Sequence, residues 1–309
     1  MSRPDSRAPR TITSPDVSVV PADDPLKFPF AQPELDACVR AALEEDGAFH
    51  DLTTIATVLS DRRDHGTVVA RDSGVIAGVP LAVAAFRLLD PHVAIRVDVD
   101  DGGRVASGTP ILRVSGLARA LLSAERVALN FLQRLSGIAT LTARYVDAVR
   151  GTRARILDTR KTTPGLRALE KYAVRAGGGR NHRFGLGDAV LIKDNHLAAV
   201  DGDVALAVQR ARDFVAPGIK IEVECDAPAQ VRAGVEAGAD IILLDNMSPA
   251  QLQECVEIVN GRALTEASGG ISLETVRAVA RTGVDRISVG AITHSAVSLD
   301  IALDFQASG

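Results

Sequence analysis

After Gly151 the chain repeats one unit, a short apolar run followed by a stretch in which apolar residues recur at helical spacing. Strands that alternate with helices in this way form parallel βαβ units. The sequence therefore predicts an α/β protein whose parallel sheet is barrel-like, complete or open on one side. The predicted strands lie at residues 154–157, 189–192, 219–223, 241–244, 263–265 and 286–289.

Polar residues or glycines follow directly after every predicted strand of this repeat. The carboxyl ends of the strands in an α/β barrel lie on one face, where the active sites of such enzymes are found. Ordinary loop solvation explains one such segment equally well, but six in succession, with charges of both signs, favour a functional site. In chain order the segments are 158–161, 193–195, 224–226, 245–246, 266–270 and 290–294.

The part of the chain before the repeat predicts a separate α+β domain. Helices are expected at 33–46 and 80–89, and strands at 66–71, 74–79, 93–98 and 109–114. Residues 117–150 form two helical patterns, which we expect to break near Ser136-Gly137 and to bridge the two domains. Residues 1–27 have no apolar periodicity and predict a flexible leader.

Composition narrows the class of function. The net charge is −4, so a broad nucleic-acid-binding surface is not expected and any basic site must be local. The longest apolar runs fall far short of the roughly 20 residues that cross a bilayer, and the N-terminus lacks the apolar core of a secretory signal, which predicts a cytoplasmic protein. Three cysteines without C-x-x-C spacing predict small buried side chains instead of disulfides or a zinc site.

Basic residues gathered after the first two strands of the repeat predict a local anion site. Guanidinium groups pair with carboxylate or phosphate through two hydrogen bonds, and ammonium groups act as point charges. We expect a lowered pKa for His182 beside Arg183, which would make it a neutral donor. The triple glycine 177–179 would allow close approach to a ligand, although a flexible loop explains it better. The cluster comprises Arg160, Lys161, Arg180, His182, Arg183 and Lys193.

Two acids at the ends of neighbouring strands complete this charge pattern. Glu224 and Asp245 are candidates for binding sugar hydroxyls or Mg²⁺, which takes few protein carboxylates and keeps phosphate and water as its other ligands. Glu222 lies deeper on the same strand face and is either a support for this site or a solvated ion-pair partner. The turns 268–270 and 290–294 offer backbone N–H groups and helix N-termini, where barrels often bind phosphate.

At these residues the chain resembles the quinolinate phosphoribosyltransferase family. The resemblance extends from about residue 28 to residue 305, and its long motifs are specific. They lie at 124–140, 158–167, 170–174, 181–183, 191–196, 266–270 and 289–295.

The resemblance implies a reaction and a fold. The pyridine nitrogen of quinolinate is joined to C1 of 5-phosphoribosyl-1-pyrophosphate, with release of pyrophosphate and CO₂, to give nicotinate mononucleotide on the route to NAD. The implied fold is an N-terminal α/β sandwich domain over 28–136 and an open α/β barrel over 137–294. A C-terminal helix at 295–309 would return to the sandwich, and the barrel would have seven strands, one more than the pattern predicts.

The resemblance also implies roles for individual residues. Lys161, Glu224 and Asp245 are expected to act in catalysis, the two acids also holding Mg²⁺ directly or through water. Arg126, which the pattern alone would class as a solvated helix charge, is expected to arrive from the other subunit of a homodimer that could assemble further. Quinolinate would lie among Arg126, Arg160, Lys161, His182, Arg183 and Lys193. Phosphoribosyl pyrophosphate would lie near Lys161, Glu224, Asp245, Ser268, Gly269, Gly290 and His294.

Two other functions stay open from the sequence. A related pyrophosphorylase-like enzyme with another acceptor would be favoured by loss of a carboxylate-binding cation, and none is missing here. A noncatalytic sensor of anions or nucleotides would need no charge stabilisation at C1, whereas Glu224 and Asp245 are both present.

Overall fold

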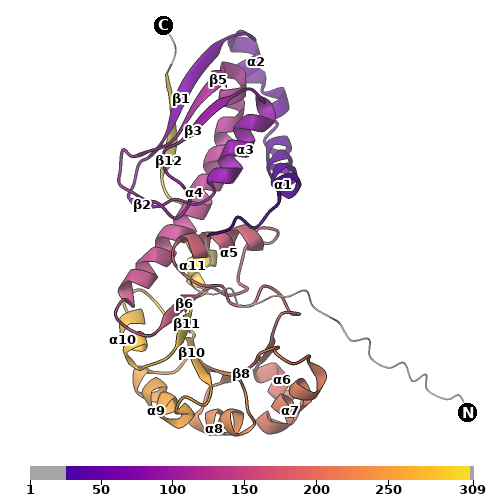
Figure 1. The fold of residues 1–309 in the computed structure, drawn as a ribbon, viewed down its shortest axis with the longest axis vertical. Coiled ribbons are helices and arrows are strands. Elements are labelled where there is room, and N and C mark those ends of the chain that lie inside the picture. The colour runs from indigo at the N-terminus through magenta and orange to yellow at the C-terminus, as the bar shows by residue number, and fades with distance from the viewer. Residues whose placement is uncertain (1–25, 307–309) are drawn as a thin grey trace, which may run out of the picture.

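The computed structural model describes residues 26–306, so the predicted leader lies outside the described residues except for its last two. Figure 1 shows a sheet domain and a barrel domain joined by one long helix, α4, Ala118–Ala148. The barrel helices α6 to α10 line the outside of the second domain, and the sheet of the first domain lies at the opposite end of α4.

The first domain is built on a four-stranded antiparallel sheet in the order β12-β1-β5-β3. Its first helix forms where predicted, because Leu35, Val39 and Leu43 recur at a spacing of four and bury one face. The predicted run 74–79 contributes only the two-residue strand β2, which pairs with β4 in a separate small sheet. The elements are α1 Gln32–Glu45, α2 Leu52–Thr57, β1 Arg63–Ala70, β2 Gly74–Val75, α3 Val79–Leu89, β3 Ala94–Val97, β4 Arg104–Val105 and β5 Pro110–Leu117.

The end of the chain corrects the prediction of a C-terminal helix. Residues 301–306 form strand β12, Ile301–Gln306, which pairs antiparallel with β1 at the edge of the first sheet. Ile301, Leu303 and Phe305 alternate with polar or small residues, which is the period of a strand and not of a helix. The chain thus returns to the first domain in a different form from the one expected, and 307–309 lie outside the described residues.

Helix α4 corrects the predicted break at Ser136-Gly137, since it runs unbroken through both residues. A Cβ on Gly137 would lie 2.1 Å from the carbonyl oxygen of Val297, so the missing side chain admits a neighbouring backbone. Ser136 Oγ accepts a hydrogen bond from the backbone N of Ala77 at 3.0 Å. Both residues therefore let backbone from other parts of the chain pack against α4. No helix in the described residues has the length and apolar character needed to cross a membrane.

The second domain is a parallel sheet of six strands in the order β6-β11-β10-β9-β8-β7. All six predicted strands are present, with bounds that shift by at most a few residues. The strands are β6 Arg155–Leu157, β7 Val190–Ile192, β8 Ile221–Cys225, β9 Ile241–Asp245, β10 Leu264–Ser268 and β11 Arg286–Ser288. The helices are α5 Arg167–Ala176, α6 Asp194–Ala198, α7 Val204–Phe214, α8 Pro228–Glu236, α9 Pro249–Val259, α10 Val276–Arg281 and α11 Ala291–His294.

The seventh strand implied by the resemblance is reduced to a single parallel bridge in the described residues, between Leu157 on β6 and Arg180. This bridge extends the sheet beyond β6, at the edge opposite β7. The sheet is therefore open between β7 and the segment at Arg180. Among the cysteines, Cys225 and Cys255 are buried and Cys38 is half-buried, and all three are free.

Candidate active site

The strand ends of the barrel bring predicted site residues from distant parts of the chain together. Ser268 lies beside Asp245 in the register of β9 and β10. Lys193, after β7, forms an ion pair with Glu224 on β8. A Cβ on Gly290 would lie 3.1 Å from Cδ of Lys161, so the segments after β6 and β11 are also in contact.

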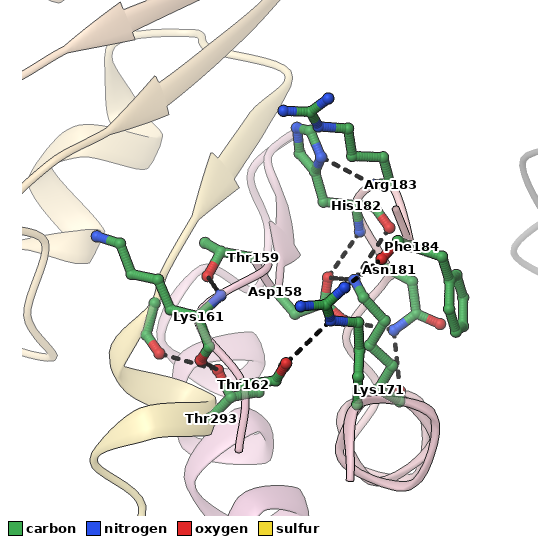
Figure 2. Close-up of polar contacts among 12 residues, drawn as sticks. Asp158, Thr159, Lys161, Thr162, Lys171, Asn181, His182, Arg183, Phe184 and Thr293 are labelled. Atoms are coloured by element: carbon green, nitrogen blue, oxygen red, sulfur yellow. Dashed lines mark hydrogen bonds and ion pairs between the residues drawn. The ribbon is translucent and has the colours of Figure 1, made fainter. Parts of the chain in front are cut away.

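A fully buried ion pair, between Lys171 and Asp158, lies beside the Asn181-His182 segment (Figure 2). Lys171 Nζ of α5 donates to Asp158 Oδ1 at 2.5 Å and to the carbonyl oxygen of His182 at 3.0 Å. The same carboxylate accepts from the backbone N of His182 at 2.8 Å and from Asn181 Nδ2 at 2.6 Å. Burial raises the pKa of Asp158 and lowers that of Lys171, and the contact between them opposes both shifts. The pair fixes the segment after β6 against the Asn181-His182 segment.

His182 lies between two buried acids, which corrects the expectation of a lowered pKa. Its Nε2 lies 3.0 Å from Glu222 Oε2 and 3.3 Å from Glu266 Oε1. Burial disfavours the charged ring, but hydrogen bonds to the two carboxylates outweigh it and raise the pKa of His182 to about 10. The N–H of Arg183 points at Nδ1 from 2.8 Å, which fits the tautomer with its proton on Nε2, so adding a second proton requires this contact to open.

The role left open for Glu222 is now decided in favour of a buried support, since it is 2% exposed and faces His182. Its pKa is raised by burial and by the charge of Glu266. His182, Glu222 and Glu266 offer ligand atoms within 4.8 Å of one another, which is the spacing of a metal site. The guanidinium of Arg286 lies 4.0 Å from Glu266 and disfavours a divalent cation there. We therefore infer that Glu222 and Glu266 hold the imidazole of His182 in place.

Two guanidinium groups of the predicted anion site lie close to each other. Arg160 Nε is buried without a hydrogen-bond partner in the described residues. Burial and the charge of Arg160 lower the pKa of Arg183, whose Nη1 donates to the carbonyl oxygen of Ala189 at 3.3 Å. Like charges held together out of water are stabilised by an anion between them, so this pair has the electrostatics of a carboxylate or phosphate site.

The acids Glu224 and Asp245 lie on neighbouring strands beside Lys193. Burial and the charge of Glu224 raise the pKa of Asp245, while Lys193, Asn246 and Lys161 lower it. Asp245 Oδ2 accepts a hydrogen bond from Asn246 Nδ2 at 2.6 Å. Two carboxylates close enough to disturb each other, at the mouth of the barrel, fit the few oxygen ligands that Mg²⁺ takes from protein.

Both predicted glycine turns are needed for close contacts. Gly269 has φ +89°, and a Cβ there would lie 2.2 Å from Asn246 Oδ1, so no side chain fits between the turns after β9 and β10. A Cβ on Gly290 would lie 3.2 Å from His294 Nε2, on the side where Lys161 also passes. Gly290 therefore brings Lys161 and His294 to the same small turn.

The structure contradicts a ligand role for the triple glycine, whereas the role of Arg126 in the site of a partner subunit stays a prediction. The triple glycine 177–179 is not a ligand loop, because a Cβ on Gly177 would lie 2.3 Å from the carbonyl oxygen of Ala139 and one on Gly179 would lie 2.7 Å from Thr142. These glycines let the segment pack against α4. Arg126 is exposed on α4, and within the described part of the chain no hydrogen bond or ion pair joins it to the cluster.

The sequence analysis did not identify the buried residues that support the site. Lys171 and Glu170 lie in a recognised motif but received no role, although charged residues on the inner face of an amphipathic helix are a detectable signal. Glu266 was expected just after its strand, in the segment 266–270, but it lies within β10 and is fully buried. A charge inside a short buried strand is the signal that could have identified it.

The fold and the site together define an α/β-barrel enzyme that acts on anionic, phosphate-bearing substrates. The family profile for "Quinolinate phosphoribosyl transferase, N-terminal domain" matches residues 51–136, and the one for the C-terminal domain matches 138–304. The chain belongs to the quinolinate phosphoribosyltransferase family.

Known relatives agree with this assignment. The chain is 50% identical over 280 residues to a nicotinate-nucleotide pyrophosphorylase [carboxylating] of Mycobacterium leprae, covering 88% of this chain and 98% of the relative. It is 43% identical over 289 residues to a mitochondrial quinolinate phosphoribosyltransferase [decarboxylating] of Nicotiana tabacum, covering 87% and 82%. The solved nicotinate-nucleotide pyrophosphorylase from Francisella tularensis superimposes with a TM-score of 0.84 at 37% identity, covering 91% and 99%.

Proposed function

We propose that this chain carries out its family's reaction, transferring the phosphoribosyl group of 5-phosphoribosyl-1-pyrophosphate to quinolinate with loss of CO₂. The single observation that carries the assignment to this site is its charge arrangement. Arg160 and Arg183 lie close enough for the charge of Arg160 to lower the pKa of Arg183, while Lys193, Glu224 and Asp245 form a mixed-charge group at the neighbouring strand ends. A dianionic acceptor fits the first group, and a pyrophosphate with its metal fits the second.

The cations hold the acceptor. The two carboxylates of quinolinate pair with Arg160, Arg183 and Lys193, because guanidinium groups bind carboxylates through paired hydrogen bonds. His182 has both ring nitrogens engaged, by the two acids below and by the N–H of Arg183. For His182 to donate to a carboxylate, one of these contacts must open. Its support of the adjacent Arg183 needs no such change.

The acids stabilise the sugar. As the pyridine nitrogen attacks C1, the bond from C1 to pyrophosphate breaks and its electron pair leaves with the pyrophosphate. Positive charge that develops on the ribose is stabilised by Glu224 and Asp245. Bound Mg²⁺ would be held by the same carboxylates, directly or through water, and would offset charge on the leaving group. Lys161 contributes charge on the same side, with Ser268, Gly269, Gly290 and His294 around the phosphates.

Decarboxylation needs no nucleophilic side chain. After ribosylation the ring nitrogen is positively charged, so the electron pair from the broken bond to CO₂ is accepted at the adjacent ring carbon. That carbon then takes a proton to give nicotinate mononucleotide. The chain's part is to hold the carboxylate next to the ring nitrogen until it leaves.

The ion pair between Lys193 and Glu224 has to open during binding. Lys193 turns from Glu224 to a substrate carboxylate, which frees Glu224 for the sugar or the metal. Binding of quinolinate would thereby free Glu224 before the sugar and the metal bind beside it.

We also propose a homodimer in which Arg126 enters the partner's site. The support is its exposed position on α4. Location in the cytoplasm stays a prediction, since the relatives include a mitochondrial enzyme of Nicotiana tabacum.

The test is incubation of the protein with quinolinate, 5-phosphoribosyl-1-pyrophosphate and Mg²⁺, followed by chromatography for nicotinate mononucleotide and capture of CO₂. Product with equal amounts of nucleotide and CO₂ supports the proposal. No product with quinolinate, but product with another aromatic acid, would assign a different acceptor. Binding of both substrates without turnover would indicate a sensor.

A further inference from the structure

A buried glutamate outside the anion site bonds to the loop that carries Lys161. Glu170 on α5 is fully buried. Its Oε1 accepts from Thr163 Oγ1 at 2.8 Å and its Oε2 accepts from the backbone N of Thr163 at 3.1 Å. Thr163 lies two residues after Lys161, in a segment with no helix or strand of its own. Glu170 thus adds side-chain bonds to a loop that lies outside the helices and strands.

Arg134 of α4 extends the connection to the turn after β11. Its Nη2 donates to Glu170 Oε1 at 2.6 Å and to the carbonyl oxygen of Thr293 at 2.6 Å, and its Nη1 donates to the carbonyl oxygen of Ala296 at 3.1 Å. One guanidinium therefore holds the acid under the loop and the backbone of α11 at once. The planar fork of Arg suits this arrangement, because its donors have fixed directions.

Thr293 closes the connection on Lys161 itself. Its Oγ1 donates to the carbonyl oxygen of Lys161 at 2.8 Å (Figure 2). The loop is consequently held at Lys161 by α11 and at Thr163 by α5. In Figure 2 the Lys161 side chain extends away from the Lys171 group, with its backbone bonded to Thr293. The stem of Lys161 passes Gly290, so both its backbone and its side chain are set against the turn after β11.

We propose that Glu170 and Arg134 are positioning residues that set the place of Lys161 for the phosphoribosyl transfer. This inference rests on the proposed role of Lys161. Neither residue touches substrate, since Glu170 is buried under the loop and Arg134 is engaged by Glu170 and two backbone carbonyls. A displacement of about 1 Å in a catalytic group can cost on the order of 10²-fold in rate. Loosening this connection should therefore lower activity without removing any substrate contact.

The test is Thr163→Val, which preserves the shape of an exposed side chain and removes only the bond from the hydroxyl to Glu170 Oε1, while the backbone bond to Oε2 remains. We expect kcat to fall about tenfold, with a smaller change in KM for either substrate, because the ground-state contacts remain. Thr163→Ser keeps the hydroxyl and should restore most of the activity. The matched control is Thr282→Val, which loses the bond from Thr282 Oγ1 to the carbonyl oxygen of Val279, 2.7 Å long, at the other end of the barrel.

A second comparison separates positioning from general stability. Thr163→Val and Thr282→Val should have the same thermal midpoint, and Glu170→Gln should lower kcat further than Thr163→Val. In a Lys161→Ala background, followed by single-turnover product formation, Thr163→Val should cause no additional loss. The inference would be overturned if Thr163→Val were as active as Thr282→Val. It would also be overturned if Thr163→Val lowered the rate of product formation equally with and without Lys161. If Lys161→Ala alone retains full activity, the proposed role of Lys161 fails, which is a distinguishable outcome.

Discussion

Replacing Lys171 by Met tests the buried ion pair that joins two segments of the site. Met keeps the length and apolar stem of Lys171 but leaves the Asp158 carboxylate buried without its cation. Breaking a buried pair costs about 3–5 kcal/mol in free energy of unfolding. Asp158 keeps two donors, the backbone N of His182 and Asn181 Nδ2, so we expect the lower end, about 3 kcal/mol.

The size of this loss should depend on pH. Burial raises the pKa of Asp158 in the folded chain, and Lys171 supplies the charge that opposes that shift. A carboxyl whose folded pKa lies above its unfolded value destabilises the fold when both states are ionised, and the penalty disappears as both states become protonated. The difference in free energy of unfolding between Lys171→Met and the original chain should therefore shrink as the pH falls through the raised folded pKa of Asp158. Adding Asp158→Asn should recover part of the loss at pH 8.

The assay is urea denaturation at fixed protein concentration, followed by far-UV circular dichroism. The matched control is Lys220→Met, because Lys220 pairs with Asp240 at 3.1 Å with 54% of its side chain exposed. An exposed pair contributes below about 1 kcal/mol. Equal unfolding free energies for Lys171→Met and Lys220→Met, with no dependence on pH, would refute the reasoning about burial.

Three further predictions concern the reaction. Mixing Arg126→Ala chains with Lys193→Ala chains should regenerate some active sites, measured as nucleotide formation after subunit exchange; exchange without activity would contradict a shared site. Asp245→Asn should lower kcat and kcat/KM together by about 10²-fold or more, whereas a raised KM with unchanged kcat would mean that Asp245 only binds substrate. Nicotinate should have a kcat/KM up to about 10⁴-fold below quinolinate, because it leaves part of the cation cluster unpaired, and phthalate should inhibit. Comparable turnover of nicotinate and quinolinate would argue for another acceptor.

The strands of the barrel could be predicted because their signal is local. Ile241–Asp245 is mostly apolar and lies between polar turns, and a short run of this kind is typical of a buried parallel strand. The C-terminal helix had no such basis, since it came from the resemblance alone, while Ile301, Leu303 and Phe305 already had the period of a strand. Pattern in the printed sequence was the better guide there.

The failures at glycines and at His182 have a different physical origin. Gly137 and Gly177 looked like a break and a loop, but the reason for each is a backbone that packs against it from a remote part of the chain. The pKa of His182 is governed by Glu222 and Glu266, which lie 40 and 84 residues further along the chain, and not by the adjacent Arg183. Sequence neighbours say little about electrostatics once the fold brings buried charges together.

Helix α4 is continuous, so it holds Arg126 and Arg134 in fixed positions relative to each other. Arg126 and Arg134 lie eight residues apart on this helix, which corresponds to about 12 Å along its axis. Arg134 is tied through Glu170 to the loop of Lys161, whereas Arg126 points to solvent where a second subunit could receive it. A break at Ser136-Gly137 would have separated the barrel from the helix segment that carries both arginines. Because the helix continues through Gly137, the position of Arg126 is fixed relative to the same barrel whose Lys161 loop Arg134 supports.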